Sequence, residues 1–166
     1  SYGLNFTPGP WIESIQINKG VGSVINGYES ITGQLNIELK KPQTAEPLFV
    51  NGYANHGGRA ELNVQLAHRF KKNASSELLL HGSSQFNKSD HNRDGFLDQP
   101  LFKQLNGYHR WHFGIPNKLE AQVGVRAIYE DRQGGQTNFN FKKDFGTKSS
   151  YGVGIKNTLV ELFTKT

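Results

Sequence analysis

The sequence predicts an all-β protein, and three observations support that prediction. Glycine is frequent at 19 of 166 residues, while hydrophobic residues make up only 35% and aromatic residues 11%. Several segments alternate between apolar and polar side chains, which is the pattern of a strand with one face of each kind. Clusters of Gly, Pro, Asn and Ser separate these segments, as turns do. A helical bundle would show a different period and fewer glycines.

Two strands are expected before Pro47. The segment that begins at Ile12 and ends at Lys19 is rich in β-branched residues. In residues 34–40, the side chains of Leu35, Ile37 and Leu39 alternate with polar ones. Pro42 ends this strand, and residues 43–47 (QTAEP) have the composition of a linker.

Six strands are expected after Pro47, and the alternation is clearest in four of them. These four read AELNVQLAHRF (60–70), GYHRWHFGI (107–115), LEAQVGVRAIY (119–129) and YGVGIKNTLVELF (151–163). In the last of them, the pattern places Val153, Ile155 and Leu159 on the apolar face. Each of these strands therefore presents one apolar and one polar face.

The connections between these strands differ in length. Short joints follow residues 70 and 115, whereas residues 87–105 and 133–149 form long loops. Short turns at one end and long loops at the other are typical of a transmembrane β-barrel with apolar side chains outward. Aromatic residues near strand ends fit the girdles of such a barrel; they are Tyr53, Tyr108, Trp111, Tyr129 and Tyr151. A soluble β-sandwich would show the same alternation, so both architectures remain open at this point.

Composition excludes several other classes. The formal charge is +5 with a pI of about 9.4, but the basic residues are scattered, so nucleic-acid binding is not expected. There is no Cys, which excludes disulfides and thiolate zinc sites. The longest apolar run has about three residues, Leu78 to Leu80, so no transmembrane helix is expected. No signal peptide is recognisable in the first residues. Neither a Ser-His-Asp arrangement nor a carboxylate pair is placed for catalysis, so the chain is not expected to be an enzyme.

The segment from Trp11 to Pro42 resembles the closing stretch of the plug domain in TonB-dependent outer-membrane receptors. The matching elements occur in the family's order: Ile12-Glu13 through Lys19-Gly20, Gly27-Tyr28, Gly33 through Ile37, and Lys40-Lys41-Pro42. The one departure is Gly33-Gln34, where many members have two glycines. The segments SITGQLNIELKKP (30–42) and DGFLD (94–98) resemble sequences in the receptors of Bacteroidetes-type bacteria.

The resemblance implies a fold in which a 22-stranded transmembrane β-barrel surrounds an N-terminal plug. Residues 1–42 would be the C-terminal part of the plug domain, 43–47 a linker, and 48–166 about six antiparallel N-terminal strands of the barrel. We therefore expect an incomplete chain, since six strands cannot close around a plug.

The resemblance also implies a function in the bacterial outer membrane. The receptor would take up a scarce nutrient (a metal ion, metal chelate, vitamin or glycan), energised by TonB, which contacts the plug upstream of Ser1. Its other partners would be the cargo and outer-membrane lipid. Polar side chains on two strands are expected to face the lumen: Glu61, Asn63, Gln65, Arg69, Glu120, Gln122 and Arg126. The alternative function is that of a soluble, calcium-stabilised β-sandwich that acts as a binding module.

The stretch DHNRDGFLD resembles the first part of an EF-hand calcium loop. Asp90, Asn92, Asp94 and Asp98 supply side-chain oxygens at positions 1, 3, 5 and 9, and Phe96 would supply its carbonyl. Gly95 stands at the position of the sharp turn, but Leu101 replaces the usual carboxylate at position 12. Calcium (Ca2+) is therefore a candidate cofactor in an outer loop. The alternative is an Asx-rich turn, because Asp, Asn and Gly all favour turns.

Overall fold

The computed structural model describes residues 6–20, 33–70, 73–115, 119–144 and 146–166. The chain forms a two-stranded sheet and a six-stranded sheet, and all strand pairs are antiparallel. The all-β prediction is therefore confirmed. Among the described residues, no helix is both long and apolar enough to cross a membrane. The Gly27-Tyr28 element of the resemblance lies outside the described residues.

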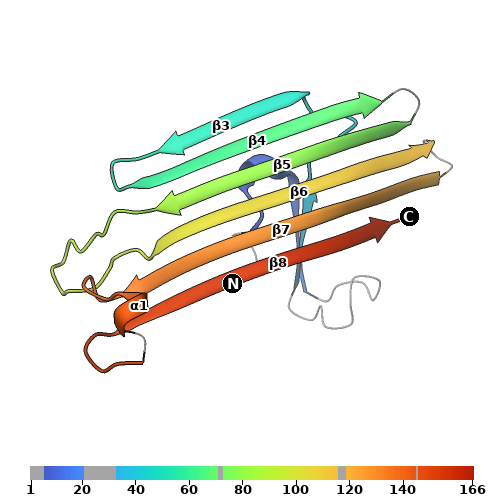
Figure 1. Cartoon of the computed structure of the whole chain (residues 1–166). Coiled ribbons are helices and arrows are strands. Elements are labelled where there is room, and N and C mark those ends of the chain that lie inside the picture. Colours follow the sequence, from blue (N-terminus) through green and yellow to red (C-terminus); the bar gives the residue numbers. More distant parts are fainter. Residues whose placement is uncertain (1–5, 21–32, 71–72, 116–118, 145) are drawn as a thin grey trace.

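The six-stranded sheet is a meander, in which every strand pairs with its neighbours in the sequence (Figure 1). Its strands are β3 (Leu48–Ala54), β4 (Arg59–Phe70), β5 (Ala74–Gln85), β6 (Leu101–Ile115), β7 (Leu119–Gly135) and β8 (Gly152–Lys165). The six strands predicted after Pro47 are thus present. The long connections β5–β6 and β7–β8 lie at the same end of the sheet (Figure 1).

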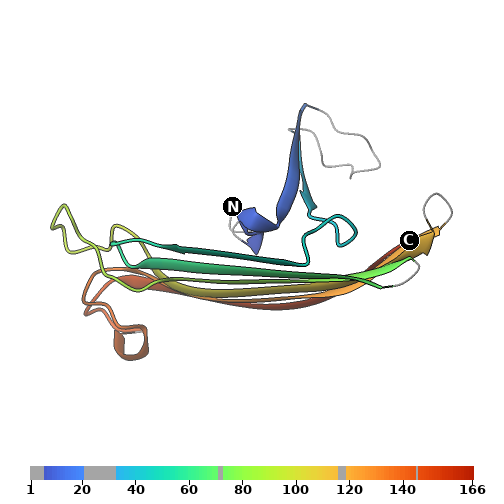
Figure 2. The same cartoon turned by 90° about the horizontal axis from the view of Figure 1, so that it is seen from above.

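The two-stranded sheet stands on one face of the larger sheet (Figure 2). It consists of β1 (Ile12–Lys19) and β2 (Gly33–Leu39), paired so that Ile15 lies opposite Ile37. A 3-10 turn, η2 (Gly9–Trp11), precedes β1 and buries the Trp11 side chain. The backbone N–H of Lys40 donates to the Trp11 carbonyl at 3.0 Å, which joins the end of β2 to the start of β1.

Strands β6 and β7 are longer than the sequence pattern indicates. β6 begins at Leu101, inside the segment predicted as a loop, and β7 continues to Gly135. In this extension Lys103 and Asp131 pair on the face that is apolar elsewhere, and Phe102 lies on the polar face, so the alternation is broken while the backbone ladder continues. A prediction based on alternation therefore ended both strands too early.

The predicted orientation of β8 is wrong. Leu159 lies opposite Ile128 and Ile155 opposite Arg132, and all four lie on the face that carries the two-stranded sheet. Val160 and Leu162 instead point to the opposite, exposed face. The apolar run Leu159-Val160 and the glycines before it obscured the phase of this strand.

The aromatic residues also divide between the two faces. Tyr129 and Trp111 lie on the exposed apolar face, as a girdle requires. Tyr108 instead lies on the opposite face, where its ring stacks on Phe163 with centroids 5.3 Å apart. Tyr53 lies on that face too, opposite Glu61. The girdle prediction is therefore wrong for Tyr53 and Tyr108.

The two long loops are bonded to each other. An isolated bridge joins Phe96 to Gln136. The Leu97 N–H donates to the Gly135 carbonyl, and the Thr137 N–H donates to the Gly95 carbonyl, both at 2.9 Å. A short helix, α1 (Phe141–Asp144), follows in the second loop and lies on the side of the sheet opposite the two-stranded sheet (Figure 2).

Candidate functional site

The six-stranded sheet buries polar side chains on one face and exposes large apolar side chains on the other, which is the reverse of the distribution usual in a soluble protein. The face beneath the two-stranded sheet buries polar residues, which are Asn63, Gln65, Ser75, Glu77, His81, Ser83, Gln85, Gln104, Asn106, Arg110, His112 and Glu130. The opposite face exposes large apolar residues, which are Leu48, Val50, Leu62, Leu66, Leu80, Leu105, Phe113, Leu119, Val123, Tyr129, Val160 and Leu162. Charged residues are almost never fully buried unless they are paired, so the polar face must hold an internal network.

All seven residues predicted to face the lumen lie on this polar face. The register places Glu61, Asn63, Gln65 and Arg69 of β4 on the same side as Glu77 and Arg110, and likewise Glu120, Gln122 and Arg126 of β7. Asn63 and Gln65 are buried beneath the docked segment, whereas Glu120 is exposed near the end of the sheet.

The predicted set omitted the polar residues of β5 and β6, which form the centre of the network. In β5 the sequence SSELLLHGSSQ does alternate, with Ser75, Glu77, His81 and Ser83 on one face. Leu79 shares that face and is fully buried, so three consecutive leucines concealed the alternation. His109 and His112 lie on opposite faces of β6, so they cannot bind one metal ion together.

An ion pair between Arg110 and Glu77 is the most buried polar contact of this face. The Arg110 Nε and Nη2 atoms lie 3.0 and 2.9 Å from Glu77 Oε2, and the two side chains are 8% and 0% exposed. Gln65 Nε2 donates to the other carboxylate oxygen at 3.3 Å. Arg110 also donates to the backbone carbonyl of Lys40. The pair therefore ties the end of β2 to the wall of the sheet.

Three further side chains of the sheet donate to backbone carbonyls of the N-terminal region. Arg69 Nη2 lies 3.1 Å from the Ala45 carbonyl. Asn106 and Arg126 donate to the Phe6 carbonyl at 3.2 and 3.4 Å. Together with Arg110, these bonds hold the segment before β1 and the linker after β2 against the same face. Backbone carbonyls accept these bonds whatever the side chain, so the docking depends on the donors of the sheet.

A polar cavity lies between η2 and the sheet, at the end that carries the long loops. Its volume is about 310 Å3, and its walls include Thr7, Pro10 and Ser83. Two guanidinium groups flank the Phe102 ring there: Arg132 at 5.0 Å and Arg59 at 5.9 Å from the ring centre. Each arginine is also bonded to a carboxylate, Arg59 to Glu61 and Arg132 to Glu130. The charges of this cavity are thus balanced in pairs.

A chain of hydrogen bonds also leads into this cavity. Asn63 Oδ1 lies 2.7 Å from His81 Nδ1, and His81 Nε2 lies 3.0 Å from the Ser83 hydroxyl. His81 is buried and has partners at both ring nitrogens, so it is a structural element of the wall rather than a lone ligand. Neutral, satisfied groups of this kind can orient a polar ligand without carrying charge.

The calcium-like loop brings part of its predicted ligand set together. Asp90 accepts bonds from the backbone N–H groups of Asp94 and Gly95, at 3.1 and 3.0 Å. The Asn92 amide nitrogen donates to an Asp94 oxygen at 2.8 Å, and the other Asp94 oxygen accepts from the Phe96 N–H. Within the described residues, there is no group of three or more His, Cys, Asp or Glu side chains that could hold a metal ion.

Asp98 is turned toward a different set of partners. Its Oδ2 atom accepts from the Ser89 hydroxyl at 2.8 Å, from the His91 N–H at 2.9 Å, and contacts His91 Nδ1 at 2.7 Å. These bonds, from the His91 side chain first, lower the pKa of Asp98 to about 2. Asp98 therefore stabilises the base of the loop, apart from the Asp90–Asn92–Asp94 group.

No family model, curated protein or solved structure matched this chain when it was compared with known proteins.

Proposed function

We propose that this chain is the plug end and the first barrel strands of a TonB-dependent outer-membrane receptor. The single observation that carries the proposal is the inversion of the two faces of the six-stranded sheet. A docked segment covers buried polar and charged side chains, while large apolar side chains are exposed on the other face. A barrel wall with a plug on its lumen side and lipid on its outer side requires this distribution.

The height of the apolar face supports a membrane position. On β7, Leu119 and Tyr129 mark the ends of the apolar positions, and Asp131 follows on the same face. Ten residues of strand extend about 34 Å. With the tilt usual for such barrels, about 40°, this segment would span about 26 Å, close to the apolar band of outer-membrane barrels.

In the proposed receptor, the polar face lines the lumen and the β1–β2 segment belongs to the plug. Further barrel strands would pair with the outer edges of β3 and β8, which end the sheet within the described residues. TonB would act on plug residues upstream of Ser1, and the cargo would be a metal ion, metal chelate, vitamin or glycan. The Arg and Asn donors that hold residues 6, 40 and 45 would anchor the plug to the wall.

The alternative, a calcium-stabilised β-sandwich, requires a second layer over the apolar face. The β1–β2 sheet lies on the polar face instead (Figure 2). In the part of the chain that the structure describes, only the loop near α1 covers apolar-side positions, where Phe139 and Phe141 lie over Gly152 and Gly154. Leu62, Leu66 and Val123 are exposed rather than packed in a core. These observations weigh against the sandwich.

The proposal can be tested by labelling single cysteines in the full-length protein in its native membrane. The 166 residues contain no Cys, and any Cys elsewhere in the full-length protein is replaced by Ser in the background used for labelling. Glu161 and Leu162 are adjacent on β8, and they point to the polar and the apolar face respectively. We expect a water-soluble maleimide to label Glu161→Cys but not Leu162→Cys until detergent is added. Equal labelling of both in membranes, or a folded protein that needs no detergent, would contradict the proposal.

A further inference from the structure

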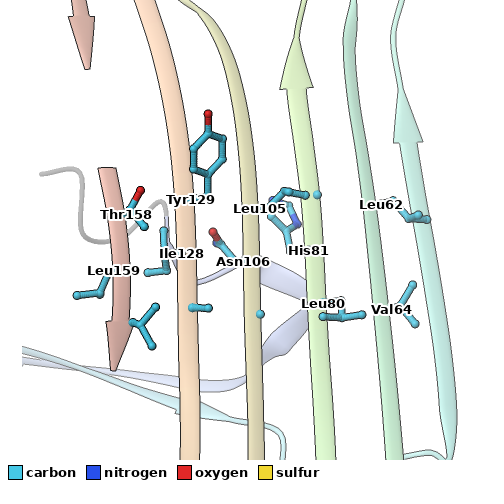
Figure 3. A pocket seen from close by; sticks show the side chains of 14 residues that line it. Leu62, Val64, Leu80, His81, Leu105, Asn106, Ile128, Tyr129, Thr158 and Leu159 are labelled. Atoms are coloured by element: carbon cyan, nitrogen blue, oxygen red, sulfur yellow. The ribbon is translucent and has the colours of Figure 1, made fainter. Parts of the chain in front are cut away.

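An apolar groove crosses the exposed face of the sheet, opposite the two-stranded sheet. It has a volume of about 540 Å3, and Figure 3 shows the side chains around it. Leu62 and Val64 form one side, and Tyr129 and Val160 form the other. Gly82, Gly107 and Ala127 form its floor, so the backbone of three strands is bare of large side chains there.

A second hollow continues this groove toward the long loops. Its volume is about 520 Å3, and it shares Leu62, Gly82, Leu105 and Tyr129 with the first. It extends further to Phe86, which is 60% exposed, and to Lys103. The two hollows form one open apolar groove on either side of Leu105. The ammonium group of Lys103 lies at the end of the groove that is nearer the long loops.

Basic side chains surround this end of the groove. Lys156 lies on the same face as Lys103, and its Nζ atom is 3.5 Å from Asp131. The same Nζ atom is 6.0 Å from the centre of the Phe141 ring, which places α1 and its exposed Lys142 and Lys143 nearby. Asp131 and Asp144 are the acidic residues of these segments, so the rim carries a net positive charge.

We propose that the groove holds an acyl chain of a membrane lipid whose phosphate headgroup has a net negative charge, with the phosphate at the rim formed by Lys103 and Lys156. The proposal rests on the membrane position given under the proposed function. The groove is apolar along its length and cationic at one end, which matches a molecule with a long apolar chain and one anionic end. In a bilayer the surrounding lipid is as apolar as the groove, so the acyl chain gains van der Waals packing from the shape of the groove, and the rim supplies selectivity for charge.

A second copy of the chain fits the same surface less well. Two copies in one membrane have the same orientation, so a symmetric contact through the groove would bring two basic rims to the same level. Like charges placed together in this way oppose association. A lipid whose headgroup has a net negative charge instead neutralises the rim. The charge distribution therefore favours the lipid as the occupant.

The experiment uses the full-length receptor, reconstituted in nanodiscs that contain equal amounts of phosphatidylglycerol and phosphatidylcholine. After transfer to detergent, native mass spectrometry counts the lipids retained by each protein. Ala127→Leu fills the floor of the groove, and Ala121→Leu is its matched control on the same face of β7, outside the groove. Lys103→Gln removes the rim charge that lines the groove itself and leaves Lys156, and Lys19→Gln on β1 removes an equal charge elsewhere.

We expect the wild-type protein to retain phosphatidylglycerol severalfold more than phosphatidylcholine. Ala127→Leu should lose most of the retained lipid, and Lys103→Gln should lose the preference for phosphatidylglycerol, while both controls behave as wild type. Equal retention of the two lipids by the wild-type protein, or no difference between Ala127→Leu and Ala121→Leu, overturns the lipid site but leaves the receptor proposal intact. A full-length chain that does not insert into nanodiscs overturns both.

Discussion

Replacing Arg110 with Ala should weaken the attachment of the N-terminal segment to the sheet more than any other single arginine change on this face. The substitution removes two bonds to Glu77 and one to the Lys40 carbonyl. It leaves the Glu77 carboxylate, which is 0% exposed, with Gln65 Nε2 as its remaining bonded partner within the described residues. Breaking a buried pair on one side typically costs about 3–5 kcal/mol, because the remaining charge is uncompensated.

Arg126→Ala provides the matched comparison. Arg126 Nη1 lies 3.9 Å from Glu161, and the two side chains are 28% and 50% exposed. Such an exposed pair contributes about 0–1 kcal/mol, and the Arg126 bond to the Phe6 carbonyl is long at 3.4 Å, so Arg126→Ala should reduce the free energy of unfolding far less than Arg110→Ala. The double variant Arg110→Met/Glu77→Leu removes both buried charges at once. It should recover most of the loss, since apolar replacement of a whole buried pair is often neutral.

The assay is urea unfolding of the full-length receptor in detergent, followed by limited proteolysis of the linker at residues 43–47. Arg110→Ala should lower the unfolding midpoint and expose residues 43–47 to protease. Arg126→Ala should lower the midpoint much less and leave residues 43–47 protected, because its bond to the N-terminal region is at Phe6. The reasoning would be refuted if both arginine variants had equal midpoints. It would also be refuted if the double variant were as unstable as Arg110→Ala, because an uncompensated charge would then not be the cause.

Three further predictions follow from the loops and turns. Gly135→Ala should destabilise the fold by about 1–3 kcal/mol, since Gly135 has a φ of +119° and an added Cβ would lie 2.4 Å from a backbone atom of Gly152. Gly9→Ala is the control: an added Cβ there would have no atom within 4 Å, so the melting temperature should change little. Asp98 keeps its bonds as a carboxylate, and its pKa is lowered to about 2 from 3.8, so the loop stabilisation should be complete above about pH 4 and lost as the pH falls through 2; an NMR titration of the Asp98 carboxyl with an ordinary midpoint would contradict this. If Ca2+ binds the Asp90–Asn92–Asp94 group, Asp94→Ala should abolish the calorimetric response to calcium, and an unchanged response would reject the site.

The sequence was most informative where one face of a strand was apolar and the other polar. β2, β4 and the central parts of β6 and β7 were all predicted from this alternation. The predictions failed where the physical cause of alternation is absent. Lys103 and Asp131 pair on the otherwise apolar face and Phe102 lies on the polar face, so the alternation is broken there although the ladder continues. Alternation reports the environment of the side chains, and it does not report the hydrogen bonding of the backbone.

The candidate site was predicted only in part, for a similar reason. The polar residues of β4 and β7 were identified because their strands have clean apolar faces. Glu77 and Arg110 form the central contact, yet their importance depends on which strands are neighbours and on where the Lys40 carbonyl lies. These relations join residues 33 and 70 positions apart. A local sequence pattern cannot contain them.

The bridge between the two long loops has a consequence for how that end of the molecule moves. Because two backbone bonds flank the pairing of Phe96 with Gln136, residues 95–97 of the first loop are joined to residues 135–137 at the start of the second. Displacing either loop requires breaking the bridge or carrying the other loop along. Any event that orders the Asp90–Asp98 stretch would therefore also fix the position of α1, on the opposite side of the sheet from the polar cavity. In the proposed receptor, binding on the lipid side of the sheet and binding at the Asp90–Asp98 stretch would then be thermodynamically linked, each altering the affinity of the other by the same factor.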